Sequence, residues 1–123
     1  MLTIETLVPV FTVCQVPDCA EIDLNGAFCF TARTDEEISL VCPAEAVPRN
    51  TVRRDDGWRG FRVQGVLDFS LIGILARIAD VLVAEEISIF AVSTYNTDYI
   101  LVRQNRFADA AEALRKAGFS VIG

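Results

Sequence analysis

The sequence predicts an α+β fold whose second half follows the ferredoxin-like order strand, helix, strand, strand, helix, strand. The first observation is a hairpin pattern at residues 87–102, in which two apolar, β-branched runs flank a short polar insert. The second is a pair of helix-periodic apolar stripes, one before the hairpin and one after it. Right-handed crossovers then place both helices on one face of a four-stranded antiparallel sheet.

The hairpin is expected to have strands at Ile87–Ser93 and Tyr99–Val102, joined by residues 94–98. That insert carries two hydroxyls, an amide, a carboxylate and an aromatic ring within five residues. One interpretation is a turn in which Asn96 and Asp98 satisfy their own backbone. The other is a polar tip that contacts a ligand.

A candidate strand at residues 58–64 and the segment 65–70 precede the first helix, for which Asp68 and Ser70 are plausible caps. Gly73 lies near the helix start, where it lowers helix propensity. Either close helix–strand packing or close approach of a ligand to the backbone would explain it. The predicted buried stripe of this helix is Leu71, Ile74, Leu75, Ile78, Val81 and Leu82.

The second helix is predicted over residues 107–117, with Gly118 as the residue that ends it and residues 119–122 as the last strand. Its buried face is expected to hold Phe107, Ala110, Ala111, Leu114 and Ala117.

The first half has strand patterns without room for two full helices. A strand over residues 7–14 is expected to begin after Pro9 or to lie at a sheet edge. Strands at 28–33 and 38–42 form a second hairpin, and residues 43–48 form one helical turn that Pro48 stops. The polar segment 49–57 is the best candidate boundary, so the predicted division is 1–57 and 58–123.

Composition and charge narrow the function classes. Residues 1–60 carry 5 basic and 10 acidic side chains, and residues 61–123 carry 6 and 7, so the net charge of −6 includes no basic stripe for nucleic acid. No apolar run is long enough to span a membrane, and the start lacks a basic leader region, so a cytoplasmic protein is expected. The mean hydropathy of +0.37 is compatible with apolar surface buried against a partner subunit.

The sequence shows none of the residue patterns that are typical of a catalytic site. The chain has no histidine, no Gly-rich phosphate loop and no nucleophile with a nearby base, so neither catalytic residues nor a cofactor is predicted. Asp68 and Asp98 could be proposed as a carboxylate pair, but capping and turn chemistry are simpler roles. The cysteines at 14, 19, 29 and 42 form no CxxC pair, which argues against zinc and favours buried, reduced thiols.

Binding chemistry fits better. Backbone N–H groups at Gly73 and Ile74, at a helix start, suit a carboxylate. Thr94 and Tyr95 could frame the ligand, and Asp98 could accept hydrogen bonds from an ammonium or guanidinium group. One zwitterionic amino acid would satisfy both poles.

The motifs Asp68-Phe69-Ser70 and Gly73-Ile74-Leu75-Ala76, followed by the hairpin strand and its Ser-Thr-Tyr-Asn-Thr-Asp tip at residues 93–98, resemble an ACT domain. More narrowly, they resemble the CASTOR-type subgroup of small two-ACT bacterial proteins and animal arginine sensors. The resemblance implies a non-catalytic regulatory module that binds an amino acid at an interface between ACT units. It also implies a complete ACT domain preceded by a truncated, β-rich ACT-like unit.

The ligand-binding residues implied by the resemblance are Gly73, Ile74, Thr94, Tyr95, Asn96 and Asp98. Tyr95 replaces a phenylalanine and Thr97 stands where an aromatic residue occurs, so arginine itself is not implied. Since the related sensors use four ACT units, a homodimer is the expected assembly. The alternatives are a ligand-free protein-interaction or oligomerisation module, and an orphan regulatory subunit that binds an unidentified biosynthetic enzyme.

Overall fold

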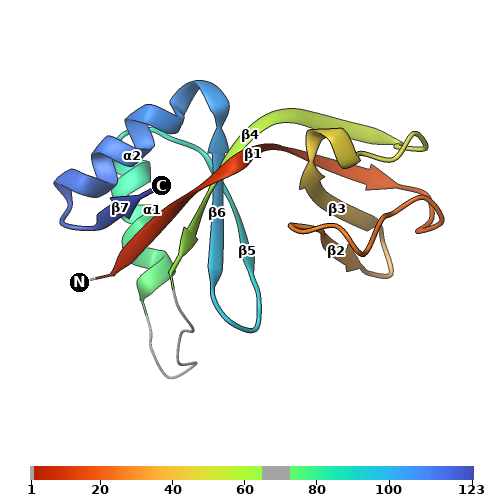
Figure 1. The fold of residues 1–123 in the computed structure, drawn as a ribbon, viewed down its shortest axis with the longest axis horizontal. Helices are drawn as coiled ribbons and strands as arrows, with labels where there is room; N and C mark the ends of the chain where they lie inside the picture. The colour runs from red at the N-terminus through yellow and green to blue at the C-terminus, as the bar shows by residue number, and fades with distance from the viewer. Residues whose placement is uncertain (1, 65–72) are drawn as a thin grey trace. The chain divides into compact units, whose positions relative to one another are not determined.

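The computed structural model describes residues 2–64 and 73–123, which form two compact units (Figure 1). The larger unit comprises residues 1–8 and 59–123, and the smaller unit comprises residues 9–58. Two long strands, β1 (Thr3–Val16) and β4 (Arg53–Val63), contribute residues to both units. The sequence-based division at 57 and 58 had instead assigned all of β1 to the first unit.

The larger unit contains the predicted strand, helix, strand, strand, helix, strand order, so the α+β ferredoxin-like fold class is confirmed. Its first strand is the end of β4. The remaining elements are α1 (Ile74–Ala84), β5 (Ile89–Ser93), β6 (Asp98–Arg103), the 3₁₀ turn η2 (Gln104–Arg106), α2 (Phe107–Lys116) and β7 (Ser120–Ile122).

The start of the chain adds a strand to this sheet, which the sequence did not predict. The sheet order in the larger unit is β5-β6-β4-β1, and β7 pairs with the other side of β1. The β1–β7 pairing is parallel, with Thr3 opposite Ser120 and Glu5 opposite Ile122. The expected four-stranded antiparallel sheet is therefore extended by one strand, and the pairing of that strand with β7 is parallel. The added strand also contributes the fully buried side chain of Ile4 to the core.

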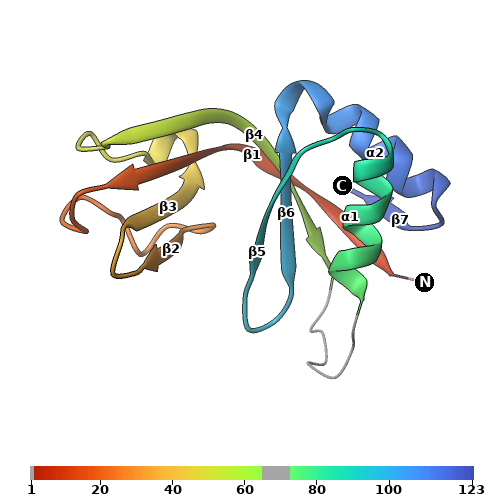
Figure 2. The same ribbon diagram turned by 180° about the vertical axis from the view of Figure 1, so that it is seen from behind.

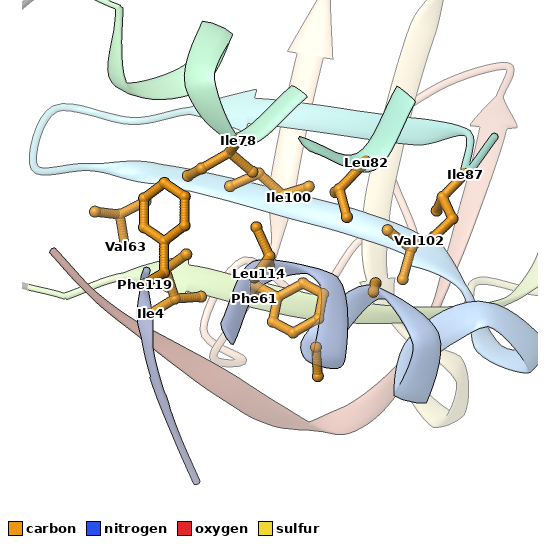
Figure 3. Close-up of a cluster of buried hydrophobic side chains, with 12 residues drawn as sticks. Ile4, Phe61, Val63, Ile78, Leu82, Ile87, Ile100, Val102, Leu114 and Phe119 are labelled. Carbon is orange, nitrogen blue, oxygen red and sulfur yellow. The ribbon is translucent and has the colours of Figure 1, made fainter. Parts of the chain in front are cut away.

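The core of the larger unit lies between this sheet and the two helices, which cover the same face (Figure 3). Ile78 and Leu82 from α1 and Leu114 from α2 are fully buried, as their periodicity predicts. Ile74, Leu75, Val81 and Phe107 pack against the core while partly buried. Ala117 is an exception, since it is the exposed residue that caps the end of α2.

Both helices end in a Schellman arrangement. In α2 the N–H of Gly118 donates to Arg115 at 3.0 Å and that of Phe119 donates to Leu114 at 3.1 Å, which confirms Gly118 as the terminating residue. In α1 the equivalent left-handed position is Glu86, with φ 57°.

Gly73 precedes α1 as its N-cap, with φ 81° in the left-handed region. A Cβ at this position would meet no described atom within 4 Å, so close helix–strand packing does not explain the glycine. Its positive φ does, because side-chain-bearing residues rarely adopt that conformation. The predicted segment 65–70, the caps Asp68 and Ser70, and Leu71 lie outside the described residues.

Strands β1 and β4 begin earlier in the chain than expected. Strand β1 runs through Pro9, whose missing N–H falls where the chain passes from one unit to the other. Strand β4 begins at Arg53, so the charged run Arg53–Asp56 is extended rather than part of a loop. Side chains two residues apart on a strand share a face, and Arg54 accordingly contacts Asp56 with a 2.9 Å ion pair.

The smaller unit has the strand order β2-β3-β1-β4, where β2 is Phe30–Arg33 and β3 is Ile38–Pro43 (Figure 2). The predicted second hairpin is thus present, although β2 begins two residues later than expected. The reason is Phe28, whose φ of 62° is incompatible with a strand.

The β2–β3 hairpin repeats the β5–β6 hairpin with a constant offset of 60 residues. Arg33 pairs with Ile38 as Ser93 pairs with Asp98, and in each loop the N–H of the threonine that follows donates to a carbonyl oxygen at 2.9 Å. A 3₁₀ turn follows each hairpin, η1 (Ala44–Ala46) in one unit and η2 in the other. Helix α2 continues from η2, whereas η1 stops at Val47, because the next residue, Pro48, disfavours helical backbone.

Candidate functional site

The tip of the β5–β6 hairpin is a four-residue loop, residues 94–97, closed by the pair Ser93 and Asp98. The N–H of Thr94 donates to the carbonyl oxygen of Thr97 at 2.9 Å, and the Thr94 hydroxyl donates to the same oxygen at 3.1 Å. The Thr94 hydroxyl therefore stabilises the turn. The turn satisfies its own backbone, but through the Thr94 hydroxyl and not through the Asn96 and Asp98 side chains that the sequence suggested.

Thr97 anchors the tip to the body of the unit. Its side chain is 5% exposed, and its hydroxyl donates to the carbonyl oxygen of Val63 at 2.7 Å. Val63 is the last residue of β4. The sequence showed Thr97 only as a departure from an aromatic position. Its structural role became visible only once the fold had brought residues 34 positions apart into contact.

Asp98 carries the negative charge of the tip, and a hydrogen bond holds its carboxylate in place. It is half-buried, and its Oδ1 accepts a 2.6 Å hydrogen bond from the hydroxyl of Ser93. This bond fixes the carboxylate and leaves Oδ2 with no hydrogen-bond donor among the described residues. Ser93 was not among the predicted site residues, although cross-strand pairing with Asp98 follows from the hairpin register.

The other predicted residues differ in exposure. Tyr95 is 79% exposed and Asn96 is exposed, so both present their side chains at the surface of the tip. Gly73 and Ile74 mark the start of α1, which lies at the same end of the unit as the hairpin tip (Figures 1 and 2). First-turn N–H groups have no partner within a helix, so this end of α1 can receive an anionic group.

A second polar group adjoins β6. The Arg62 guanidinium forms an ion pair with Glu5 at 3.0 Å and lies over the ring of Tyr99, 5.9 Å from its centroid. Hydrogen bonds to Tyr99 and Glu5 raise the pKa of Arg62. The sequence did not indicate this cluster, because its members come from three different strands.

Among the described residues, no group of three or more potential ligands could hold a metal ion. All four cysteines are free thiols; Cys14 and Cys42 are buried, as expected, whereas Cys29 is only half-buried and Cys19 is exposed. Burial, together with the neighbouring thiols Cys14 and Cys29, raises the pKa of Cys42 to about 12. Within residues 2–64 and 73–123, no helix has the length and apolarity to cross a bilayer.

The sequence profile described as "ACT domain" matches residues 53–116, which are 64 of the 123 residues. The chain belongs to the ACT domain family. The matched region covers β4 to α2 and includes every predicted ligand-binding residue. This assignment confirms the family and leaves the CASTOR-type subgroup as a proposal. No protein with a curated description matches the sequence.

Solved structures agree with the family. A structural-genomics protein from Agobacterium tumefaciens is 31% identical, with a TM-score of 0.87 over 99% of this chain and 93% of that chain. A protein from Vibrio cholerae, titled as a possible transport protein, is 20% identical, with a TM-score of 0.73 over 94% of this chain and 88% of that chain. The regulatory subunit of aspartate kinase from Thermus thermophilus has a TM-score of 0.65 at 8% identity, over 94% and 96% of the two chains. The last two likenesses show the fold alone.

Proposed function

We propose that this protein is a non-catalytic regulatory ACT module that binds a small amino acid, in the manner of a CASTOR-type sensor. The observation that carries the proposal is Asp98, which Ser93 holds at the β5–β6 tip with one carboxylate oxygen available. Family membership supports a regulatory role, and the hydrogen bond that Asp98 accepts from Ser93 supports its proposed role as the cation acceptor.

The ligand would be bound by its two charged ends. Its ammonium group donates to Asp98, a charge-assisted contact. Its carboxylate lies at the start of α1, near the backbone N–H groups of Gly73 and Ile74. The exposed side chains of Tyr95 and Asn96 contact the remainder of the ligand, and Thr94 shapes the loop that carries them.

The proposed arrangement has a complete ACT domain at residues 58–123, a truncated ACT-like unit at residues 1–57, and a cytoplasmic homodimer. The repeated hairpin supports the ACT-like reading of the smaller unit, because β3 and β6 occupy equivalent places 60 residues apart. Two chains supply four units, and the amino acid binds where ACT units meet. Size-exclusion chromatography with light scattering should give twice the chain mass of 13.5 kDa.

The competing function is a ligand-free interaction module, or an orphan regulatory subunit that binds a biosynthetic enzyme. The fold likeness to an aspartate kinase regulatory subunit that covers 94% of this chain favours the second version. A sensor and an orphan regulatory subunit would both bind an amino acid, so only a search for a bound enzyme separates them. A complete lack of amino-acid binding would favour the ligand-free interaction module.

The experiment is thermal unfolding against each of the twenty amino acids at millimolar concentration. A ligand at about 100 times its Kd adds about 2.7 kcal/mol, which is roughly 10 °C for a domain of this size. Asp98→Asn should abolish the shift, and Asp80→Asn, an exposed aspartate on α1, should leave it unchanged. Absence of a shift for any amino acid with the folded wild-type protein would contradict the proposal.

A further inference from the structure

Three of the cysteines lie together on one face of the sheet in the smaller unit. Cys14 on β1 and Cys42 on β3 are buried in one cluster with Leu40, and Cys29, which directly precedes β2, packs against that cluster. The Cys29 sulfur also lies 3.8 Å from the hydroxyl oxygen of Thr31, the residue that pairs with Leu40. Residues two apart on a strand share a face, so these contacts place the three thiols on the same face.

The strand register brings Cys29 directly opposite Cys42. Continuing the antiparallel β2–β3 register by one residue beyond its first pair joins positions 29 and 42. The repeated hairpin of the larger unit shows the same relationship, because the positions 60 residues later are Ile89 and Val102, a directly opposed pair of the β5–β6 ladder. Both of those aliphatic side chains pack in the core of the larger unit. In the smaller unit, both members of the pair are thiols.

This direct opposition suits a disulfide bond. Opposed residues of an antiparallel pair have Cα atoms about 4.5–5.5 Å apart, which falls within the range of about 4.4–6.8 Å that disulfides require. Cys14 is opposite Leu40 and therefore diagonal to Cys42, and diagonal neighbours are typically about 7–8 Å apart. The geometry therefore selects Cys29, rather than Cys14, as the partner of Cys42.

We propose that Cys29 and Cys42 form a reversible oxidation site, at which hydrogen peroxide converts the two thiols into a disulfide. The loop at residues 34–37 joins one end of the β2–β3 hairpin, and the disulfide would fasten the other end. This inference concerns a different part of the chain from the proposed amino-acid site and does not depend on it.

The reaction has two steps. The Cys29 thiolate attacks one peroxide oxygen and the O–O bond breaks, which leaves a sulfenic acid on Cys29, while the departing hydroxide takes up the proton that Cys29 released and becomes water. The Cys42 sulfur then attacks the Cys29 sulfur and the S–O bond breaks. The second hydroxide leaves with the Cys42 proton, also as water. Two thiols and one peroxide thus give one disulfide and two waters, and a thiol reductant reverses the change.

The two thiols differ in access, which sets their order of reaction. Cys29 is half-buried, whereas Cys42 is 2% exposed, so a peroxide from solvent reaches Cys29 first. Burial above all raises the pKa of Cys42 to about 12, so this thiol is not attacked by itself. It acts instead as the resolving thiol, because a neighbour held in place reacts at a high effective concentration.

The test uses the full chain carrying Cys19→Ser, which removes the exposed thiol and so prevents disulfides between molecules. After treatment with hydrogen peroxide, unfolding and alkylation, mass spectrometry should find Cys14 alkylated, Cys29 joined to Cys42, and two hydrogen atoms lost from the intact protein. Dithiothreitol should restore all three thiols. An additional Cys14→Ser should keep the disulfide, whereas an additional Cys29→Ser should abolish it.

Hydrogen exchange gives a second measurement, which needs no substitution in the pair. The amides of β2 should exchange more slowly in the oxidised protein, and those of β5, in the repeated hairpin, should not change. Three results would overturn the proposal: Cys29 still free after peroxide treatment, a disulfide that joins Cys14 to Cys42, or Cys29 oxidised to a sulfinic acid while Cys42 stays free. Unchanged exchange of β2 in the disulfide form would contradict the fastening of the hairpin.

Discussion

The hydroxyl of Thr97 donates a 2.7 Å hydrogen bond to the carbonyl oxygen of Val63 and so ties the β5–β6 tip to the end of β4. Both residues are buried, so solvent does not readily replace a hydrogen-bond partner lost there. The position of the tip relative to the rest of the larger unit therefore depends on this contact.

Replacing Thr97 with valine should destabilise the protein by about 1–3 kcal/mol, because it leaves the Val63 carbonyl without its donor while keeping the side-chain shape. Urea unfolding measures the change. Thr31→Val makes the same replacement at an exposed strand position and should cost less than about 0.5 kcal/mol. Equal losses of unfolding free energy in the two variants would show that the hydrogen bond from Thr97 to Val63 adds no stability beyond that of an exposed hydroxyl.

Glu86 ends α1 in the left-handed conformation that a glycine adopts at the end of α2. Glu86→Gly should therefore stabilise the protein by about 1 kcal/mol, since the backbone strain is relieved. Its neighbour Glu85 has φ −96°, so Glu85→Gly should be neutral or destabilising. Thermal unfolding of both variants measures the contrast, and a lower melting temperature for Glu86→Gly would contradict the prediction.

Asp56 links stability to pH. A hydrogen bond from Arg54, and then one from Thr12, lowers the pKa of Asp56 below its ordinary value. A carboxyl whose folded-state pKa is depressed adds stability above its unfolded pKa near 3.9, and that stability is lost as the pH falls through the folded value.

Asp56→Asn should accordingly reduce the loss of stability between about pH 5 and pH 2, when urea unfolding is compared across that range. Asp80→Asn, at an exposed helix position, serves as the control and should retain the wild-type slope. An unchanged slope for Asp56→Asn would mean that the Arg54 and Thr12 contacts do not persist in solution.

The core of the larger unit should respond to cavity formation. Ile78 is fully buried between α1 and the sheet, so Ile78→Ala should cost about 2–5 kcal/mol in urea unfolding (Figure 3). Val83 lies on the same helix with 64% of its surface exposed, and Val83→Ala should cost less than about 1 kcal/mol. Similar losses of stability in the two variants would mean that α1 does not pack on the sheet through the face that carries Ile78.

Local patterns predicted the elements well because their causes are local. The stripe on α1 identified Ile78 and Leu82 as core residues, and Gly118 marked the end of α2 through its conformational freedom. The turn residue Pro48 correctly limited η1 to a single turn, because proline acts on the residue directly before it.

Long-range relationships were less accessible. The insertion of β1 beside β7 joins the two ends of the chain, and no periodicity encodes that pairing. The same limit applies to the site: the hairpin register brings Ser93 to Asp98, but the bond from Thr97 to Val63 depends on the tertiary fold. The tip residues stay candidate ligand contacts, and the structural roles of Ser93, Thr94 and Thr97 became visible only in the structure.

Isothermal titration calorimetry with the amino acid that gives the largest thermal shift tests the central claim most directly. We expect a saturable isotherm for the wild type and for Glu37→Gln, and loss of binding in Asp98→Ala, because Asp98 belongs to the proposed amino-acid site and Glu37 does not. Undiminished binding by Asp98→Ala, or no heat of binding for the wild type, would contradict the assignment of amino-acid recognition to the β5–β6 tip.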